Sequence, residues 1–201
     1  MKMKKLVALC KRTGIFRLFD KIGEGGELLG QWMGDGYAAY PLNGIPVLDE
    51  ETLCAVFDIT EKQREKFSIR RVEMPETVNF DDTDPAERLI TEDDVSIIYS
   101  GIEVKPLKTR SGIIFIQSKY LSPLEDVLEV TQLFERQTAD GLSYIVAKTG
   151  LLIAAVIFPY SVVDDRFVDR LEEITEACRR ALNTQQNIRP AEQDTDQTQI
   201  F

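Results

Sequence analysis

Short runs of apolar residues, each closed by glycine or other turn-forming residues, recur along most of this sequence. Runs of about four to eight residues with these boundaries are typical of β-strands, and short turns join antiparallel neighbours. We therefore predict a mostly antiparallel sheet, with the first two strands forming a hairpin. The predicted strands cover residues 6–9, 15–19, 37–42, 68–72, 95–99, 102–107, 113–117, 131–137, 144–148 and 151–158.

The C-terminal part of the sequence predicts a long amphipathic helix. Its apolar residues recur at intervals of four, three, four and four, which places them on one helical face. We expect this face to pack on the sheet, with Cys178 as a small core residue. The residues of the face are Phe167, Leu171, Ile174, Cys178 and Leu182.

Local composition also predicts shorter helices and the domain limits. One helix is expected after Asp49, where acidic residues favour the positive end of the helix dipole. A second is expected over residues 60–67 from a capping-box pattern, and a third over residues 121–129. Sheet and helices together predict one α+β domain over residues 1–182, followed by a polar tail over residues 183–201.

The two ends of the sequence resemble each other. Residues 14–21 align without gaps with residues 141–148, and an acidic helix start follows in both segments. We therefore hypothesise two repeats of three strands and one helix, at residues 4–57 and 131–182, which share one core. The alternative is that unrelated segments of this kind share glycine turns and acidic helix starts.

Charge is distributed unevenly along the chain, whose net charge is −10. Residues 1–21 contain seven basic residues and one acid, and Lys11, Arg12 and Arg17 are the candidates for a nucleic-acid contact. Residues 73–94 contain nine acids and one arginine. The acidic segment raises the alternative of an enzyme that uses carboxylates and Mg²⁺. The acidic segment lacks a calcium-loop pattern, so no metal ligand is assigned. For the basic segment and the acidic segment alike, the alternative is a solvated charged surface without a ligand.

The chain contains no histidine, which excludes Ser-His, Cys-His and His-metal chemistry within it. Its three cysteines are far apart and predict neither a disulfide framework nor a zinc site, so a reducing cytoplasm is expected. The apolar run over residues 6–10 is too short for a signal peptide, and that over residues 151–160 is too short to span a membrane. We expect no cofactor, and the composition favours a protein that is not an enzyme.

Residues 53–67 resemble the helix–turn–helix of DNA-binding regulators, with Phe57 and Phe67 at apolar positions of that motif. Asp58 stands where the turn of the motif usually has glycine, and Arg64 stands where its second helix needs an apolar contact. The segment is also acidic, which is unfavourable beside phosphates. We interpret it as two short helices joined by a tight turn.

The tail ends in two large apolar residues, Ile200 and Phe201, which favour a bound partner. With Gln197 they resemble the short peptide that docks replication proteins onto bacterial sliding clamps, although Thr198 stands where leucine is usual. The acidic tail also resembles the partner-binding tip of single-stranded-DNA-binding proteins. The alternative is that the tail folds back on its own core.

Residues 34–42 and the helices after them resemble uncharacterised bacteriophage and prophage proteins. This resemblance implies a bacterial cytoplasm and no particular activity. We therefore expect a non-catalytic interaction or accessory protein of phage or mobile-element type. Its role in DNA metabolism would depend on a protein partner held by Gln197, Ile200 and Phe201, and the sequence leaves the oligomeric state open.

Overall fold

The computed structural model describes residues 1–91, 95–110 and 112–188, with side chains up to residue 184. The chain divides into two compact units, Met1–Tyr160 and Ser161–Phe201. The boundary lies before the long C-terminal helix, whereas the sequence predicted a single domain up to residue 182.

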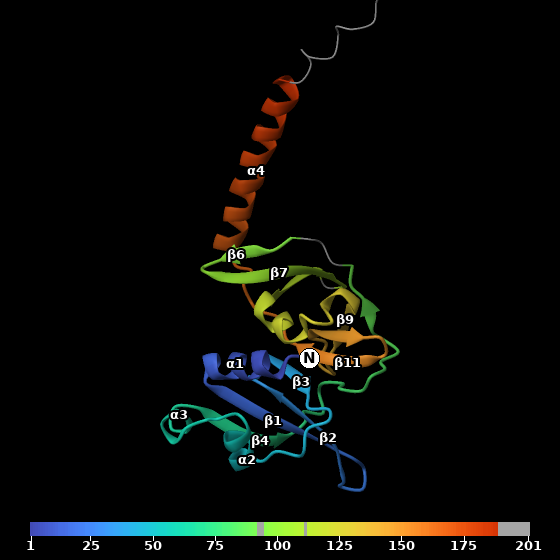
Figure 1. The fold of residues 1–201 in the computed structure, drawn as a ribbon. Helices are drawn as coiled ribbons and strands as arrows, with labels where there is room; N and C mark the ends of the chain where they lie inside the picture. The colour runs from blue at the N-terminus through green and yellow to red at the C-terminus, as the bar shows by residue number, and fades with distance from the viewer. Residues whose placement is uncertain (92–94, 111, 189–201) are drawn as a thin grey trace, which may run out of the picture. The chain divides into compact units, whose positions relative to one another are not determined.

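A large sheet of eight strands forms the frame of the first unit (Figure 1). Its neighbouring strands are antiparallel, except that β1 and β4 are parallel. This confirms the predicted α+β class and the mostly antiparallel pairing. In spatial order the strands are β4 (Ser68–Glu73), β1 (Ile15–Ile22), β2 (Leu28–Gly34), β3 (Ala38–Pro41), β11 (Leu152–Ile157), β10 (Ser143–Thr149), β9 (Thr131–Gln137) and β5 (Arg88–Leu89).

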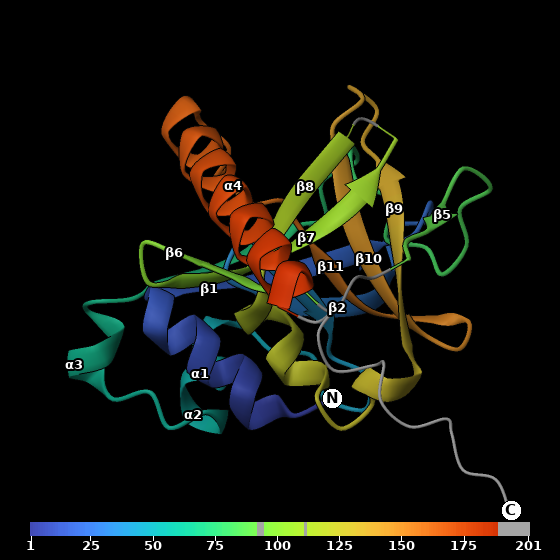
Figure 2. The same cartoon turned by 90° about the horizontal axis from the view of Figure 1, so that it is seen from above.

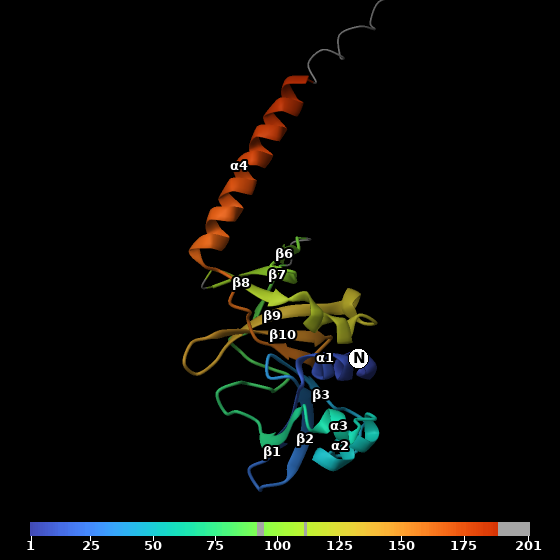
Figure 3. The same ribbon diagram turned by 90° about the vertical axis from the view of Figure 1, so that its left-hand side faces the viewer.

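A smaller antiparallel sheet consists of β6 (Ile97–Tyr99), β7 (Ile102–Thr109) and β8 (Gly112–Gln117). Figures 1 and 3 show it on the side of β9 and β10, and Figure 2 shows β5 at the outer edge beside β9. Two 3₁₀ helices, η1 (Ser118–Leu124) and η2 (Leu128–Val130), connect β8 to β9. They replace the α-helix predicted over residues 121–129, and Pro123 lies inside η1.

The predicted N-terminal hairpin is wrong, because its first strand is a helix. α1 (Met3–Thr13) buries Leu6, Val7, Leu9 and Cys10, whose spacing is helical rather than alternating. The residues interpreted as a turn form the helix end. Gly14 adopts φ 70° there and its N–H bonds to the carbonyl of Cys10, a left-handed cap that glycine adopts without strain.

Two predicted short helices are confirmed, whereas the strands β2 and β5 were not predicted. Asp49 caps α2 (Glu50–Val56), and a capping box opens α3 (Glu61–Arg64). β2 follows a glycine-rich loop and lacks a clear alternation of buried and exposed residues at its end, where four consecutive residues are buried. Figure 3 shows α1, α2 and α3 on the same side of the sheet half that contains β1 and β2.

The two hypothesised repeats differ at their first element. In the first repeat this element is α1, whereas in the second it is β9. The following aligned segments do match in type, because β1 and β10 are both strands. Each is also followed along the chain by a strand that pairs with it, β2 and β11 respectively.

The second unit contains α4 (Asp165–Ile188), which confirms the predicted C-terminal helix. Its apolar face is largely exposed, with 58% of Ile174 and 56% of Leu182 accessible. Cys178, which the sequence predicted to be a small core residue, is also exposed on this helix. Periodicity places apolar residues on one face of a helix, but it does not specify what covers that face.

Candidate functional site

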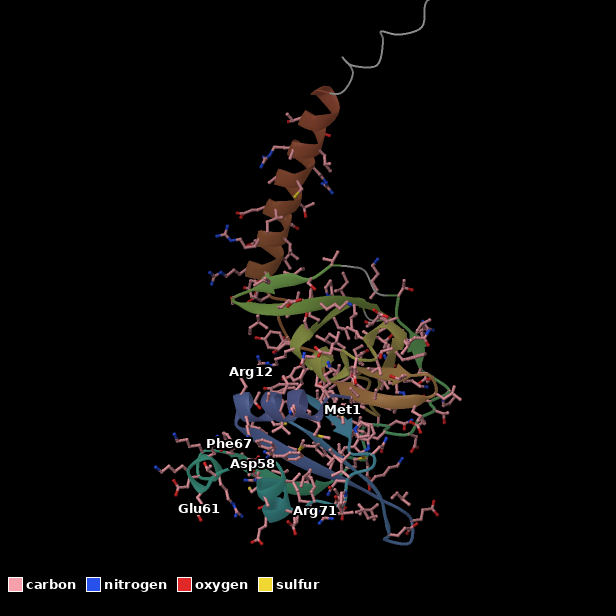
Figure 4. The ribbon with its side chains drawn as sticks, viewed as in Figure 1. Met1, Arg12, Asp58, Glu61, Phe67 and Arg71 are labelled. Atoms are coloured by element: carbon pink, nitrogen blue, oxygen red, sulfur yellow. The ribbon has the colours of Figure 1, made fainter. Side chains whose placement is uncertain are left out.

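The three basic residues predicted to contact nucleic acid do not form one patch. Nζ of Lys11 donates to the carbonyl of Phe57 at 3.0 Å, and Nη1 of Arg17 donates to Oγ of Ser68 at 3.2 Å. Figure 4 shows Arg12 at the C-terminal end of α1. Successive helix positions point about 100° apart, so neighbours such as Lys11 and Arg12 face different surroundings.

The acidic segment is bound to the sheet by internal ion pairs. Oε1 of Glu87 accepts from Nζ of Lys148 at 2.7 Å, and Oε2 accepts from Nη2 of Arg136 at 2.6 Å. Asp81 pairs with Lys21, and Oδ1 of Asp82 accepts from the backbone N–H of Ile153. Part of the acidic segment therefore serves as internal counter-charge to the sheet.

Arg136 is the centre of this ion-pair cluster and its side chain is fully buried. Its Nη1 also donates to the backbone carbonyls of Asn79 and Asp81, at 3.1 and 2.7 Å. Burial by itself would raise the pKa of Glu87, but hydrogen bonds from Lys148 and Arg136 outweigh it and hold the pKa below its usual value. Within the described ranges, no three residues of the metal-binding types come together.

A second feature is a cleft of about 520 Å³ between the end of α1, the β6–β7 turn and η1. Arg12 lines it from α1, whereas Gln117, Ser118 and Lys119 line it from the segment where β8 meets η1. Glu103 is the acidic residue in the lining. Among the described residues, the lining therefore has two cationic side chains and one carboxylate.

The position of η1 beside this cleft is fixed by a buried hydrogen-bond network. The hydroxyl of Tyr120 donates to Oδ2 of Asp35 at 3.0 Å, and the hydroxyl of Tyr40 donates to the carbonyl of Tyr120 at 2.6 Å. Oδ1 of Asp35 accepts from the backbone N–H groups of Tyr37 and Ala38. Burial and the charge of Asp35 raise the pKa of Tyr120, which keeps its hydroxyl protonated as the donor.

Sequence reasoning identified Arg12 and missed Lys119, Gln117 and Ser118. These residues are separated from Arg12 by more than a hundred positions, and their segment has no motif. Their proximity depends on the tertiary packing of η1, so no local pattern indicates it.

The third feature is the apolar face of α4 in the second unit. Besides Ile174 and Leu182, the exposed residues on this side include Ala177, Cys178 and Ala181. Most charged residues of the helix lie outside this stripe, and Arg170 and Glu173 form an exposed ion pair. An exposed apolar stripe on a helix is typical of a contact surface.

Comparison with known proteins adds no assignment, because no family model, curated protein or solved structure matches the chain. The resemblance to phage proteins therefore stays a prediction. Gln197, Ile200 and Phe201 lie outside the described residues. Among the helices of the described part, none is long and apolar enough to cross a membrane.

Proposed function

We propose that this chain is a non-catalytic interaction protein, and that α4 is its contact surface, pairing with α4 of a second copy. The observation that supports this most is the exposure of Ile174, Cys178 and Leu182 on one face of a continuous helix. An amphipathic helix in water gains most of its stability by packing its apolar face. A second copy offers the same face, which is the requirement for a symmetric dimer.

The pattern of charges along α4 favours a helical partner. With Leu171 and Cys178 at position a of a seven-residue repeat, Ile174 and Ala181 occupy position d. From residue 171 to residue 184 the flanking e and g positions hold Thr175, Ala177, Leu182 and Thr184. Every charged residue in this stretch falls at position b, c or f, so the a, d, e and g positions form an uncharged band wide enough for a second helix.

An antiparallel arrangement suits the charges of α4 better than a parallel one. Residues 165–176 contain five acids and two arginines, whereas residues 177–188 contain two arginines and no acid. Antiparallel pairing places the acidic half of each helix beside the basic half of the other, and parallel pairing places like charges together. It also allows Leu171 to face Ala181 and Ile174 to face Cys178, so that large residues meet small ones.

Sedimentation of the full chain tests this proposal, with Leu182→Asp and Asn183→Asp as a matched pair. Both variants add the same charge to the same helical turn, but Leu182 lies on the uncharged band and Asn183 at position f, outside it. We expect the wild-type mass to rise toward the dimer as concentration increases. Leu182→Asp should weaken association at least about tenfold because it buries an unpaired carboxylate, and Asn183→Asp should leave it unchanged.

A monomer at every concentration over about a hundredfold range would contradict the proposal, as would equal effects of the two variants. Unchanged circular dichroism of the full-length variants provides the folding control. Deleting residues 197–201 should leave the dimer intact, because the predicted tail peptide is a separate contact. Loss of the dimer on this deletion would indicate that the dimer contact lies in the tail and not in α4.

Disulfide crosslinking tests the helix orientation. In a parallel pair the two Cys178 residues face each other and crosslink on oxidation. In the antiparallel pair they are offset by about 6 Å along the helix axis, and Ile174→Cys should create the crosslink by facing Cys178 of the other copy. Rapid crosslinking of the wild-type chain would contradict the antiparallel arrangement, and Cys178→Ser in the Ile174→Cys chain should abolish the crosslink.

The alternative of a Mg²⁺-dependent carboxylate enzyme receives less support. Its best candidates for ligands in the described part of residues 73–94 include Asp81 and Glu87, which already pair with Lys21, Arg136 and Lys148. An accessory role in DNA metabolism through Gln197, Ile200 and Phe201 remains compatible with a dimer, because two copies would present two tails.

A further inference from the structure

The cleft beside η1 contains two basic side chains for which the described residues supply no ion-pair partner, Arg12 and Lys119. Nζ of Lys119 lies 4.7 Å from the centre of the Tyr120 ring, a cation–π contact. Burial lowers the pKa of Lys119, Asp35 partly opposes this, and the nearby charge of Arg12 lowers it further. Two cations held together in this way attract an anion.

Polar side chains accompany these cations. Gln117 is 7% exposed and lines the cleft. Oγ of Ser118 is buried and, within the described part of the chain, is without a hydrogen-bond partner. A buried polar group without a partner is costly, and a ligand oxygen at this position would relieve that cost.

We propose that this cleft binds the phosphate group of a small phosphate monoester. The two cations outnumber the one carboxylate of the described lining, Glu103, which favours an anion, and the planar guanidinium of Arg12 suits two phosphate oxygens at once. The amide of Gln117 supplies a neutral donor, and a change of rotamer would bring the hydroxyl of Ser118 to a third oxygen. The volume of about 520 Å³ leaves room for the organic part of the ligand beside Ile102.

The surroundings favour a small ligand over a nucleic-acid backbone. A backbone contact needs a row of cations, and affinity rises with the number of phosphates neutralised. Lys11 and Arg17 point to partners elsewhere in the fold, and the net charge of the chain is −10. Two cations in a concave site therefore fit one phosphate group better than a polymer.

Binding of inorganic phosphate and of glycerol phosphate to the full chain, at constant ionic strength, tests the proposal by calorimetry and by thermal shift. We expect a rise of a few degrees in the melting temperature at millimolar ligand. Arg12→Gln and Lys119→Gln should each weaken binding at least about tenfold, since each removes a charge-assisted hydrogen bond. Lys4→Gln provides the matched control, because Lys4 is exposed on the same helix and lies outside the cleft.

Ser118→Ala provides a readout that a structural role alone would not give. Without ligand it should not lower the melting temperature, because it removes a buried hydroxyl to which the described residues supply no partner; with ligand it should weaken binding. No heat and no thermal shift at millimolar phosphate would overturn the proposal, as would an equal loss of binding in Lys4→Gln. Binding of a single-stranded oligonucleotide in preference to glycerol phosphate would also overturn it and assign the cleft to nucleic acid.

Discussion

Glu87→Gln is expected to lower the free energy of unfolding by about 3 kcal/mol at neutral pH, because it removes the counter-charge of two buried cations. The side chain of Arg136 is completely buried and that of Lys148 is 6% exposed, and both donate to Glu87. Breaking a buried ion pair from one side is costly because the other charge stays buried. Glu87 itself is 16% exposed, so water reduces the cost and we expect the lower end of the usual range.

The effect of Glu87→Gln should depend on pH in a defined direction. Lys148 and Arg136 hold the pKa of Glu87 below its usual value of 4.5, so the folded chain favours the charged carboxylate. The stabilisation is therefore fully present above about pH 4.5 and is lost as the pH falls through the lowered pKa. We expect the difference between wild type and variant in urea unfolding to shrink as the medium is acidified.

Glu76→Gln is the matched control, because Glu76 is an exposed acid in the same segment. Its effect on the free energy of unfolding should stay within about 0.5 kcal/mol. Equal effects of the two substitutions would show that the acidic segment acts through its overall charge and not through the Glu87 contacts. A difference that persists unchanged at pH 3 would contradict the titration of Glu87 as its cause.

Gly34→Ala is expected to destabilise the first unit by about 3 kcal/mol or more, because an added Cβ would meet backbone. That Cβ would lie 1.7 Å from the carbonyl oxygen of Ala38 and 2.8 Å from its carbonyl carbon. The same oxygen accepts from the backbone N–H of Asp35, and Gly34 pairs with Ala39 in the sheet. The clash can therefore be relieved only by opening the β2–β3 hairpin.

Gly30→Ala in the same strand is the control, because a Cβ at Gly30 would find no atom of the described residues beyond its chain neighbours within 4 Å. Its effect should lie between neutral and a stabilisation of about 0.5–1 kcal/mol, since alanine restricts the unfolded chain. Thermal unfolding of the two variants checks the prediction. Similar melting temperatures for Gly34→Ala and wild type would mean that the hairpin accommodates a side chain at this position.

The role of the acidic segment illustrates what a sequence leaves open. Its composition predicted either a solvated loop or a metal site, because nine acids stand close together along the chain. The basic partners of Glu87 are 49 and 61 positions away, on β9 and β10. Which opposite charges meet depends on the order of strands in the sheet, and that order is not encoded in the composition of either segment.

At the N-terminus, by contrast, basic residues that are close in sequence contact different parts of the fold. Lys11, Arg12 and Arg17 are neighbours in sequence and were predicted to act together. In the structure Lys11 contacts the end of α2, and Arg17 contacts the start of β4. Arg12 instead lines a cleft together with Lys119, which lies more than a hundred positions further along the chain.

Local pattern alone determined the strand-rich α+β class, the short helices after Asp49 and Thr60, and the existence of α4. These features depend on residues within one or two turns of each other, so neighbouring side chains suffice to specify them. Tertiary structure decided that Glu87 binds Arg136 and Lys148, and that Arg12 and Lys119 line the same cleft. Such choices depend on which distant segments share a core, because packing and charge pairing act between parts of the chain that the local sequence does not connect.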